Sequence, residues 1–505
     1  MKRFQLLLIF VLFITFHCAA QEIVYSDYNN EDNREINFEI LGKQGSNYII
    51  YKNVRWKHIL AIYNDNMKMI RSFRMPYISD KTFNIDFITY PDHFYIVYQY
   101  QKSNTIFCNA VKLDNNGNKI SGPVLLDSTR VWPRQGQKIY TTKYSEDKKH
   151  ILVYKMVPFS NQMHIVNKRY DNNMVLQDSI RTVYEYDDRT DVFSDIVIDN
   201  DGTIIFGMGE MPRRRSNIRT VELITKVAGK ELSTVNIPLQ NMFIDEFRLK
   251  VDNKNRQYII NSFYYPESTG DIQGMFMCVI KMNSIYPKTA FYPFADSLRK
   301  KMASADTKGA FNNLFMRNVI VTKDGGFLVA AENSYSISTG GLPFNRYNYM
   351  GNPNSYSSIY DYNLMSSNFN SYYRPYYHNN YFQNTRYHYD DILLFSVNND
   401  LTVDWNNVIP KKQVDEGDDN FMSFAIVNTG GEIQFLFLEK ERNLQLISNH
   451  GVSPSGYIKR YATLKSREAG YEFMPKLAKQ VTATKVIIPC LYRGNICFAL
   501  VDFAS

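Results

Sequence analysis

The sequence predicts an all-β protein in which four-stranded blades are arranged as a β-propeller. A strand–turn–strand unit recurs along most of the chain, and its copies follow one another at a spacing of about 50 residues, which is typical of propeller blades. Signals for helices are few, and the clearest of them is a short helix expected within residues 294–305. Two of these units supply four antiparallel strands, which is one blade.

Residues 1–20 have the pattern of a secretory signal peptide. Lys2 and Arg3 precede an apolar run over residues 4–16, and Ala19-Ala20 supplies the small residues of a cleavage site. The run is shorter than the roughly 20 apolar residues that cross a bilayer, and no later run has that length, so we expect no transmembrane segment. The predicted location is periplasmic or extracellular. A lipoprotein anchored at Cys18 in the outer membrane is the alternative, although His17 lacks the small side chain expected before a lipidated cysteine.

The repeat consists of two kinds of hairpin. Residues 194–209 and 318–331 illustrate the first kind, in which Asp, Asn or Gly forms a tight turn between two apolar strands. Residues 110–120 and 392–405 illustrate the second kind, which follows the first. The first hairpins start near residues 36, 83, 139, 193, 244, 313, 420 and 471. This count favours eight blades, with seven as the alternative.

The last unit lacks one strand, and the N-terminus has one to spare. After Lys476 only three strands can be found before the chain ends, whereas residues 22–26 form an isolated strand pattern. Pairing residues 22–26 with the strand near Phe498 would close the ring and remove two exposed sheet edges. Residues 21–505 are therefore predicted to form a single propeller domain.

Four cysteines remain after residue 20, which is too few for a disulfide-based scaffold. Cys490 and Cys497 flank a hairpin that is predicted to turn at Arg493-Gly494, a register that places them opposite each other. Directly opposed residues lie about 4.5–5.5 Å apart, within the range that a disulfide can bridge. Two buried thiols are the alternative interpretation.

The hairpins centred on residues 201–206 and 323–331 resemble those of bacterial exported propellers of the delta-60, kelch-like and quinoprotein-like kinds. The resemblance extends over most of the mature chain and consists of a regular alternation of Asp-Gly turns and apolar strands. It implies the propeller fold and transfers no catalytic residue. The double glycines of kelch repeats and the tryptophan-docking motif of quinoprotein blades do not recur here.

No catalytic, cofactor-binding or metal-binding residue is predicted. Phosphate-binding glycine loops, nucleophile elbows and zinc signatures are absent from the sequence. Residues 114–117 and 199–202 have calcium-like oxygens, but the acid that completes a calcium loop is missing, so hairpin turns explain them. The acid pairs Asp187-Asp188, Asp390-Asp391 and Asp418-Asp419 are expected in connecting segments. Removal of residues 1–20 leaves 56 basic and 50 acidic residues, a balance too mild for a nucleic-acid-binding protein.

One face of the propeller should carry the functional loops. In each blade, the loop between the second and third strands lies on the same face as the connection to the next blade. The long connections of this chain fall there, including basic segments at residues 55–58, 130–134, 211–215 and 411–412. Trp132, Arg213, Arg214 and Arg215 are therefore candidate partner-binding residues, because rigid scaffolds place function on such loops.

The largest departure from the repeat is an insertion over residues 336–389, between the two hairpins of the sixth blade. It holds 12 of the 38 tyrosines and a single acid, Asp361. Tyrosine offers a flat apolar ring with a polar tip, which suits the surfaces of sugars and proteins. Candidate partner-binding residues in the insertion are Tyr372, Tyr373, Tyr376 and Tyr377.

These features predict an exported, non-enzymatic scaffold that binds a protein, a glycan or another envelope component through its long-loop face. A glycan-active lyase or hydrolase and a structural envelope subunit are the alternatives. A cluster of acids and histidines over the central channel would favour the enzyme. The sequence indicates neither the partner nor the oligomeric state.

Overall fold

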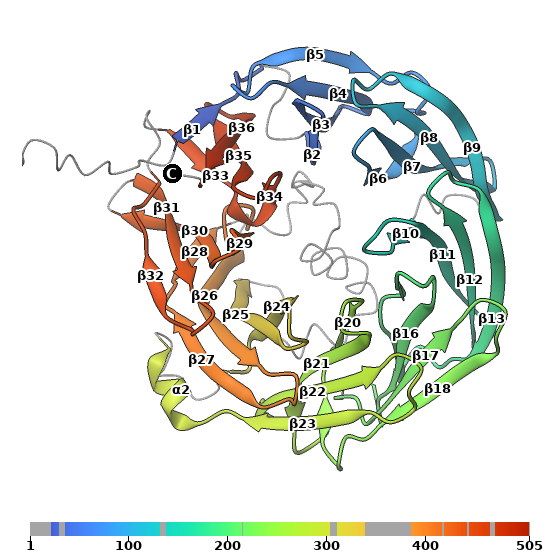
Figure 1. Cartoon of the computed structure of the whole chain (residues 1–505), viewed down its shortest axis with the longest axis vertical. Coiled ribbons are helices and arrows are strands. Elements are labelled where there is room, and N and C mark those ends of the chain that lie inside the picture. The colour runs from blue at the N-terminus through green and yellow to red at the C-terminus, as the bar shows by residue number, and fades with distance from the viewer. Residues whose placement is uncertain are drawn as a thin grey trace, which may run out of the picture.

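Eight four-stranded antiparallel sheets stand around a central axis, so the chain is an eight-bladed β-propeller (Figure 1). The computed structural model describes residues 22–29, 36–131, 138–214, 216–302, 311–338, 385–416, 419–441, 444–464 and 470–503. The predicted fold class and the favoured blade number are confirmed. The first strand of each blade starts within a few residues of the predicted position, from β2 at Asn37 to β33 at Tyr471.

The first four blades contain these strands, from the innermost outward: β2 (Asn37–Gln44), β3 (Asn47–Val54), β4 (Lys57–Tyr63) and β5 (Met69–Arg74); β6 (Thr82–Thr89), β7 (His93–Lys102), β8 (Thr105–Asp114) and β9 (Lys119–Arg130); β10 (Tyr140–Tyr144), β11 (His150–Phe159), β12 (Gln162–Asp171) and β13 (Leu176–Glu185); and β14 (Asp191–Phe193) with β15 (Val197–Ile198), β16 (Ile204–Glu210), β17 (Thr220–Lys226) and β18 (Leu232–Ile237).

The last four blades contain β19 (Phe243–Ile244) with β20 (Arg248–Asp252), β21 (Gln257–Tyr265), β22 (Gly274–Lys281) and β23 (Lys288–Pro293); β24 (Leu314–Val321), β25 (Phe327–Ser338), β26 (Thr385–Val397) and β27 (Val403–Ile409), with β28 (Gln413–Glu416) beside β26; β29 (Phe424–Asn428), β30 (Ile433–Glu441), β31 (Leu444–Val452) and β32 (Ile458–Arg460); and β33 (Tyr471–Phe473) with β34 (Lys479–Gln480), β35 (Lys485–Tyr492), β36 (Asn495–Asp502) and β1 (Glu22–Tyr25).

Helices play a minor part. The predicted helix is present as α2 (Asp296–Lys301), a single surface turn in the connection from blade 5 to blade 6, with Leu298 as its one buried side chain. A 3₁₀ turn, η2 (Pro475–Leu477), separates β33 from β34. No helix in the described ranges is long and apolar enough to cross a membrane.

The core is a ring of eight apolar clusters, one between each pair of neighbouring blades. Blades 1 and 2 share one cluster, and the series continues around to a cluster shared by blades 8 and 1. Successive side chains of a strand point to opposite faces of its sheet, so each blade contributes to the cluster on either side. Both faces of the central strands are consequently buried, as in β21, where all nine residues are buried.

The N-terminal strand closes the ring, as predicted. β1 pairs antiparallel with β36, with Val24 opposite Leu500 and Tyr25 opposite Ala499. The backbone N–H of Ser26 then donates to the carbonyl oxygen of Phe498 at 2.8 Å. Ile23 and Tyr25 pack into the cluster between blades 7 and 8, and Val24 packs into the cluster between blades 8 and 1. β1 therefore joins the two ends of the chain in blade 8 (Figure 1).

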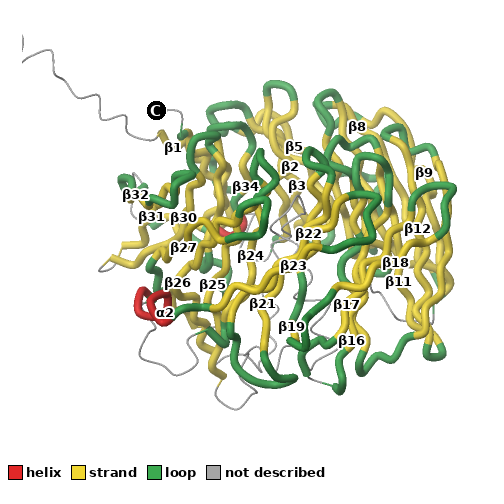
Figure 2. Tube along the Cα trace, turned by 60° about the horizontal axis from the view of Figure 1, so that its bottom comes forward, coloured by secondary structure: helices red, strands yellow, loops and turns green. Residues whose placement is uncertain are grey.

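The connections fall on two opposite faces of the propeller (Figure 2). One face, called here the short-turn face, carries the turns between first and second strands and between third and fourth strands. Equivalent turns of neighbouring blades are hydrogen-bonded there: the N–H of Asp147 donates to Asn200 Oδ1 at 3.0 Å, and the N–H of Asn200 donates to Asn253 Oδ1 at 2.9 Å. The side chain of Asn253 reaches back to Glu146 Oε2 at 2.8 Å. Polar groups of these turns are therefore hydrogen-bonded to the turns of other blades.

We expect removal of β1 to destabilise the whole ring. A chain beginning at Asp27 would lose the side-chain burial of Ile23, Val24 and Tyr25, worth about 3 kcal/mol, and would expose the edge of β36. Thermal unfolding followed by circular dichroism should show a lower Tm than for a chain beginning at Gln21. Tyr28→Ala, a change just beyond the strand at a residue that is 42% exposed, is the matched control and should have a much smaller effect. Equal melting curves for the two chain lengths would contradict closure by β1.

Candidate binding site on the long-loop face

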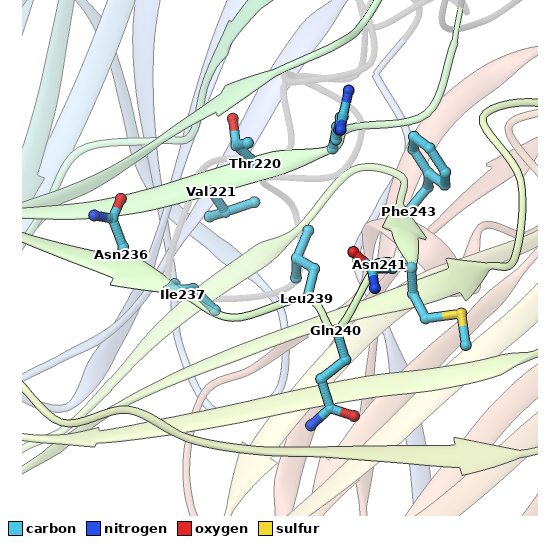
Figure 3. Close-up of a pocket in the computed structure, with 10 residues that line it drawn as sticks. Thr220, Val221, Asn236, Ile237, Leu239, Gln240, Asn241 and Phe243 are labelled. Atoms are coloured by element: carbon cyan, nitrogen blue, oxygen red, sulfur yellow. The ribbon is translucent and has the colours of Figure 1, made fainter.

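The other face of the propeller, called here the long-loop face, carries the connections between blades and the loops between second and third strands. At blades 4 and 5 it is hollowed by a cavity of about 510 Å³. The lining residues come from the start of β17, the end of β18, the connection at residues 238–242 and the start of β19: Arg219, Thr220, Val221, Asn236, Ile237, Leu239, Gln240, Asn241, Met242 and Phe243 (Figure 3).

The wall of this cavity includes a tight turn at Leu239–Met242. The N–H of Met242 donates to the carbonyl oxygen of Leu239 at 2.8 Å, and Gln240 and Asn241 both have positive φ values, 50° and 63°. Two consecutive left-handed residues define a type I′ turn, which Asn favours and Gln does not. The turn holds the amide side chains of Gln240 and Asn241 on the exposed side of the cavity.

The predicted arginine segment lies in the loop that leads into the same cavity. Arg213 and Arg214 are exposed on the loop between β16 and β17, which ends at Arg219. The loop is anchored on both sides: the hydroxyl of Ser216 donates to the carbonyl oxygen of Arg213 at 2.7 Å, and the N–H of Asn217 donates to Ser268 O at 2.8 Å. Ile218 forms an antiparallel bridge with Ile244 of blade 5. Arg215 lies outside the described residues.

Sequence reasoning found this loop but missed the cavity beside it. The cavity is formed by β17, β18 and the following connection, and no local pattern indicates that these segments leave space between them. The available signal was the polar pair Gln240-Asn241, which separates two apolar segments and does not belong to the repeat.

The basic segment at residues 55–58 is divided between the surface and the core. Arg55 and Trp56 form a turn with φ values of 50° and 68°, and Trp56 is 55% exposed on the long-loop face. His58 is buried instead: its Nδ1 lies 2.7 Å from the hydroxyl of Tyr51, and its Nε2 lies 3.1 Å from the carbonyl oxygen of Ser79. Burial lowers the pKa of His58 to about 4. His58 is therefore a neutral core residue and adds no charge to this face.

Lys411 was expected on a basic surface, and that expectation is wrong. Its side chain is fully buried, with Nζ 2.9 Å from Glu332 Oε1 and 3.0 Å from Gln413 Oε1. Arg317 Nε lies 2.9 Å from the other oxygen of Glu332, and the hydroxyl of Ser423 donates to that oxygen at 2.8 Å. Glu332 is the only acid that can compensate Lys411 at this distance among the described residues, so the two charges are buried together. Of the predicted pair, only Lys412 is exposed.

The insertion predicted at residues 336–389 is partly strand. Residues 336–338 belong to β25 and residues 385–389 belong to β26, where Ser336 pairs with Tyr387. Asp390 and Asp391, expected in a connection, also lie within β26 and are buried, because the hairpin continues past the blade and β28 pairs with its far side. Burial raises the pKa of Asp390 to about 6. Tyr372, Tyr373, Tyr376 and Tyr377 lie outside the described residues, as does Trp132.

The extension formed by β25, β26 and β28 has one buried and one exposed face. Ser334, Tyr389 and Gln413 are buried on the inner face. On the outer face, Ile337 is 54% and Val414 is 44% exposed. Between them the rings of Tyr335 and His388 stack with centroids 4.5 Å apart, and Arg386 Nε bonds Glu416 Oε1 at 3.1 Å. The exposed face of this extension therefore combines two apolar side chains with a stacked ring pair and an ion pair.

Charged side chains of the innermost strands balance one another. Burial raises the pKa of Glu39 well above its usual range, an effect that Lys479 opposes and Asp86 reinforces. Lys143 Nζ lies 3.3 Å from Asp195 Oδ2. These residues lie in or next to the first strands of different blades, and none of them is a histidine. In the described ranges, no three His, Cys, Asp or Glu side chains are arranged to hold a metal ion.

The two calcium-like segments are turns, as predicted. Asp114 Oδ1 accepts hydrogen bonds from the N–H groups of Asn116 and Asn118, at 2.9 and 2.7 Å. Asp199 Oδ1 does the same for Asp201 and Thr203, at 3.0 and 2.8 Å. The carboxylates therefore organise their own backbone.

The register predicted for the cysteine hairpin is confirmed. Cys490 is opposite Cys497, and Arg493 and Gly494 form the turn with positive φ values. Both side chains are buried free thiols, with their Sγ atoms 3.1 Å apart. The alternative of two buried thiols describes the structure, and a disulfide between them stays a prediction.

No protein-family model matches the sequence, and no curated protein matches it. Solved structures similar to the chain include the WD40 domain of SCAP from fission yeast, with 9% identity, a TM-score of 0.39 and coverage of 96% of this chain and 98% of that one. Sqt1 of Saccharomyces cerevisiae has 8% identity, a TM-score of 0.42 and coverage of 95% and 98%. The polysaccharide lyase Uly1 has 10% identity, a TM-score of 0.38 and coverage of 83% and 89%.

At these identities and TM-scores the similar structures carry no argument about function. The finer resemblance to delta-60, kelch-like and quinoprotein-like propellers has no match among families or curated proteins.

Two neighbouring lysines test the buried ion pair. Lys411→Met should lower the free energy of unfolding by up to about 3–5 kcal/mol, because it removes one of the two cations beside the buried Glu332 and leaves only Arg317 to compensate that charge. Lys412→Met, one residue along and exposed, should change it by less than about 0.5 kcal/mol. Urea unfolding of both variants at neutral pH measures the difference, and similar effects from the two changes would contradict the assignment.

The stability contributed by His58 should depend on pH. The pKa is about 4 in the folded chain and about 6.5 in an unfolded one, so the unfolded chain binds a proton first as pH falls. The contribution is complete above pH 6.5 and is lost between pH 6.5 and pH 4, by about 2–3 kcal/mol. His58→Gln keeps a polar side chain without a titrating ring, so its unfolding free energy should decline less over this interval. Parallel declines for the two proteins in urea unfolding would refute this cause.

Proposed function

We propose that the protein is an exported, non-enzymatic scaffold that binds a protein, a glycan or another envelope component through its long-loop face. The observation that carries the proposal is the cavity at blades 4 and 5 together with the arginine loop that leads into it. Export rests on the signal-peptide pattern of residues 1–20.

The two faces of the propeller differ in what they offer a partner. On the short-turn face, polar groups of neighbouring turns are bonded to one another, as in the series Asp147, Asn200 and Asn253. The long-loop face carries the cavity, the exposed Arg213 and Arg214, the exposed Trp56, and Ile337 and Val414 on the exposed face of the β25–β26–β28 extension. Aromatic and arginine side chains are enriched among the residues that dominate protein interfaces.

Binding also fits the residues better than catalysis does. Catalysis by acid and base requires titrating groups that are accessible and suitably separated. Acids in or next to the described innermost strands are instead held by neighbouring groups: Asp195 lies beside Lys143, and Asp252 accepts hydrogen bonds from Asn255 and Gln257. The residues that line the cavity include no acid and no histidine.

Site-specific photo-cross-linking in intact cells tests this proposal. A photoreactive amino acid placed at Gln240, on the rim of the cavity, should form a discrete adduct with the partner. The same substitution at Lys230, an exposed residue of the same blade on the short-turn face, is the control and should form none. Protease and periodate treatment of the adduct then distinguish a protein partner from a glycan. Absence of an adduct at Gln240, or equal adducts at both positions, would contradict the proposal.

A further inference from the structure

The cavity at blades 4 and 5 has four polar side chains on its rim that have no partner among the residues that the structure describes. Arg219, Asn236, Gln240 and Asn241 are exposed, and none of these side chains makes an ion pair or a hydrogen bond with any part of the chain that the structure describes. By contrast, the hydroxyl of Thr220 donates to Glu210 Oε2 at 3.3 Å. The unpaired rim groups supply the donors of one guanidinium and three amides.

The charge of the lining is positive. Arg219 is the one ionisable side chain among the ten lining residues. Arg213 and Arg214 on the preceding loop add two positive charges, which together with Arg219 outweigh the negative charge of Glu210 at the edge of the site. A guanidinium binds a carboxylate through two parallel hydrogen bonds, and these charge-assisted bonds are stronger than those to a neutral acceptor. The lining therefore fits a ligand with a single carboxylate close to Arg219.

The floor of the cavity is aliphatic. Val221, Ile237 and Leu239 are buried members of the cluster between blades 4 and 5, and Met242 and Phe243 are half-buried beside them. Sugar rings are bound mainly on flat aromatic side chains, of which this cavity has one. A branched aliphatic side chain matches a floor of Val, Ile, Leu and Met, because such groups bury apolar surface without needing hydrogen bonds.

We propose that this cavity binds a peptide segment in which a carboxylate is adjacent to a large aliphatic side chain. The aliphatic group lies on the floor formed by Val221, Ile237 and Leu239, Arg219 pairs with the carboxylate, and the amides of Gln240 and Asn241 bond the peptide backbone. The volume of about 510 Å³ lies within the range of about 300–1,000 Å³ found for ligand pockets. This inference rests on the proposed function, since it names the ligand class of the same face.

Fluorescence anisotropy with defined probes tests the inference. The first probe is a fluorescein-labelled peptide with a free C-terminal Asp-Leu-Leu sequence, the second is the same peptide with both carboxylates as amides, and the third has alanine in place of both leucines. The purified mature chain should bind the first probe at least tenfold more tightly than either of the others, a difference of about 1.4 kcal/mol.

Variants assign this binding to the cavity. Arg219→Gln should weaken binding of the first probe at least tenfold and leave binding of the amide probe unchanged, whereas Arg219→Lys should give an intermediate affinity. Arg130→Gln changes an exposed arginine of blade 2 on the same face, one without an ion pair among the described residues, and should have no effect. Unchanged thermal unfolding of the variants would show that folding is not the cause.

Three outcomes would overturn the inference: no measurable binding of the first probe, equal binding by the wild-type chain and Arg219→Gln, or Arg219-dependent binding of a uronic-acid oligosaccharide in place of the peptide. The last outcome would identify the ligand as an acidic glycan. An adduct at Gln240 in cells without binding of the peptide would refute only the peptide ligand. Peptide binding without any adduct would refute the proposed function and retain the ligand class.

Discussion

Burial of both faces of every blade depends on closure of the ring. Each sheet has apolar side chains on both faces, and the eight clusters exist only because each blade has a neighbour on either side. A single sheet of this composition would expose two apolar faces and two edges to water. The pairing of β1 with β36 completes blade 8 and so allows both of its faces to be covered. The remaining structure is arranged around this constraint.

Closure of the ring also determines which parts of the fold can vary in length and sequence. Because strand edges point to the axis and the outside and sheet faces are covered by neighbours, only the two ends of the strands are free to vary. Turns on one end are short and bonded to one another through side chains such as Asn200 and Asn253. The other end accepts longer connections, since they join blades across a wider gap. The cavity, the arginine loop and the extension of β25 and β26 all lie there.

Charge is handled differently in the interior and on this surface. Glu332, Lys411 and Arg317 are buried together where the β25–β26 extension meets blade 7, and their distances of 2.9 Å compensate the loss of solvation. At the cavity, Arg219 has no acidic partner in the described structure and remains in water. A charge that is held by the protein contributes to its architecture, whereas a charge left to solvent is available to a ligand.

The sequence by itself predicted the propeller and its closure, and it favoured eight blades over seven. Apolar alternation and Asn, Asp or Gly turns are local properties that recur at a regular spacing, so the strands could be located and the number of blades estimated from the sequence. The missing final strand and the spare residues 22–26 then implied the β1–β36 pairing, and the spacing of Cys490 and Cys497 implied their register. The long-loop face was also predicted, because in a four-stranded antiparallel blade the loop between the second and third strands and the connection to the next blade must lie on the same face.

Only the tertiary structure decided which polar side chains are exposed to solvent and which are buried against a partner. Lys411 and Lys412 are adjacent and chemically alike, yet one is buried against Glu332, 79 positions away in sequence, and the other is in water. His58 adjoins the exposed Trp56 and Lys57 but turns inward to Tyr51 and Ser79. The cavity required β17, β18 and the turn at Leu239–Met242 to meet at one place. Such outcomes depend on contacts between distant segments, which local patterns do not encode, whereas strands and turns depend on neighbours in the chain.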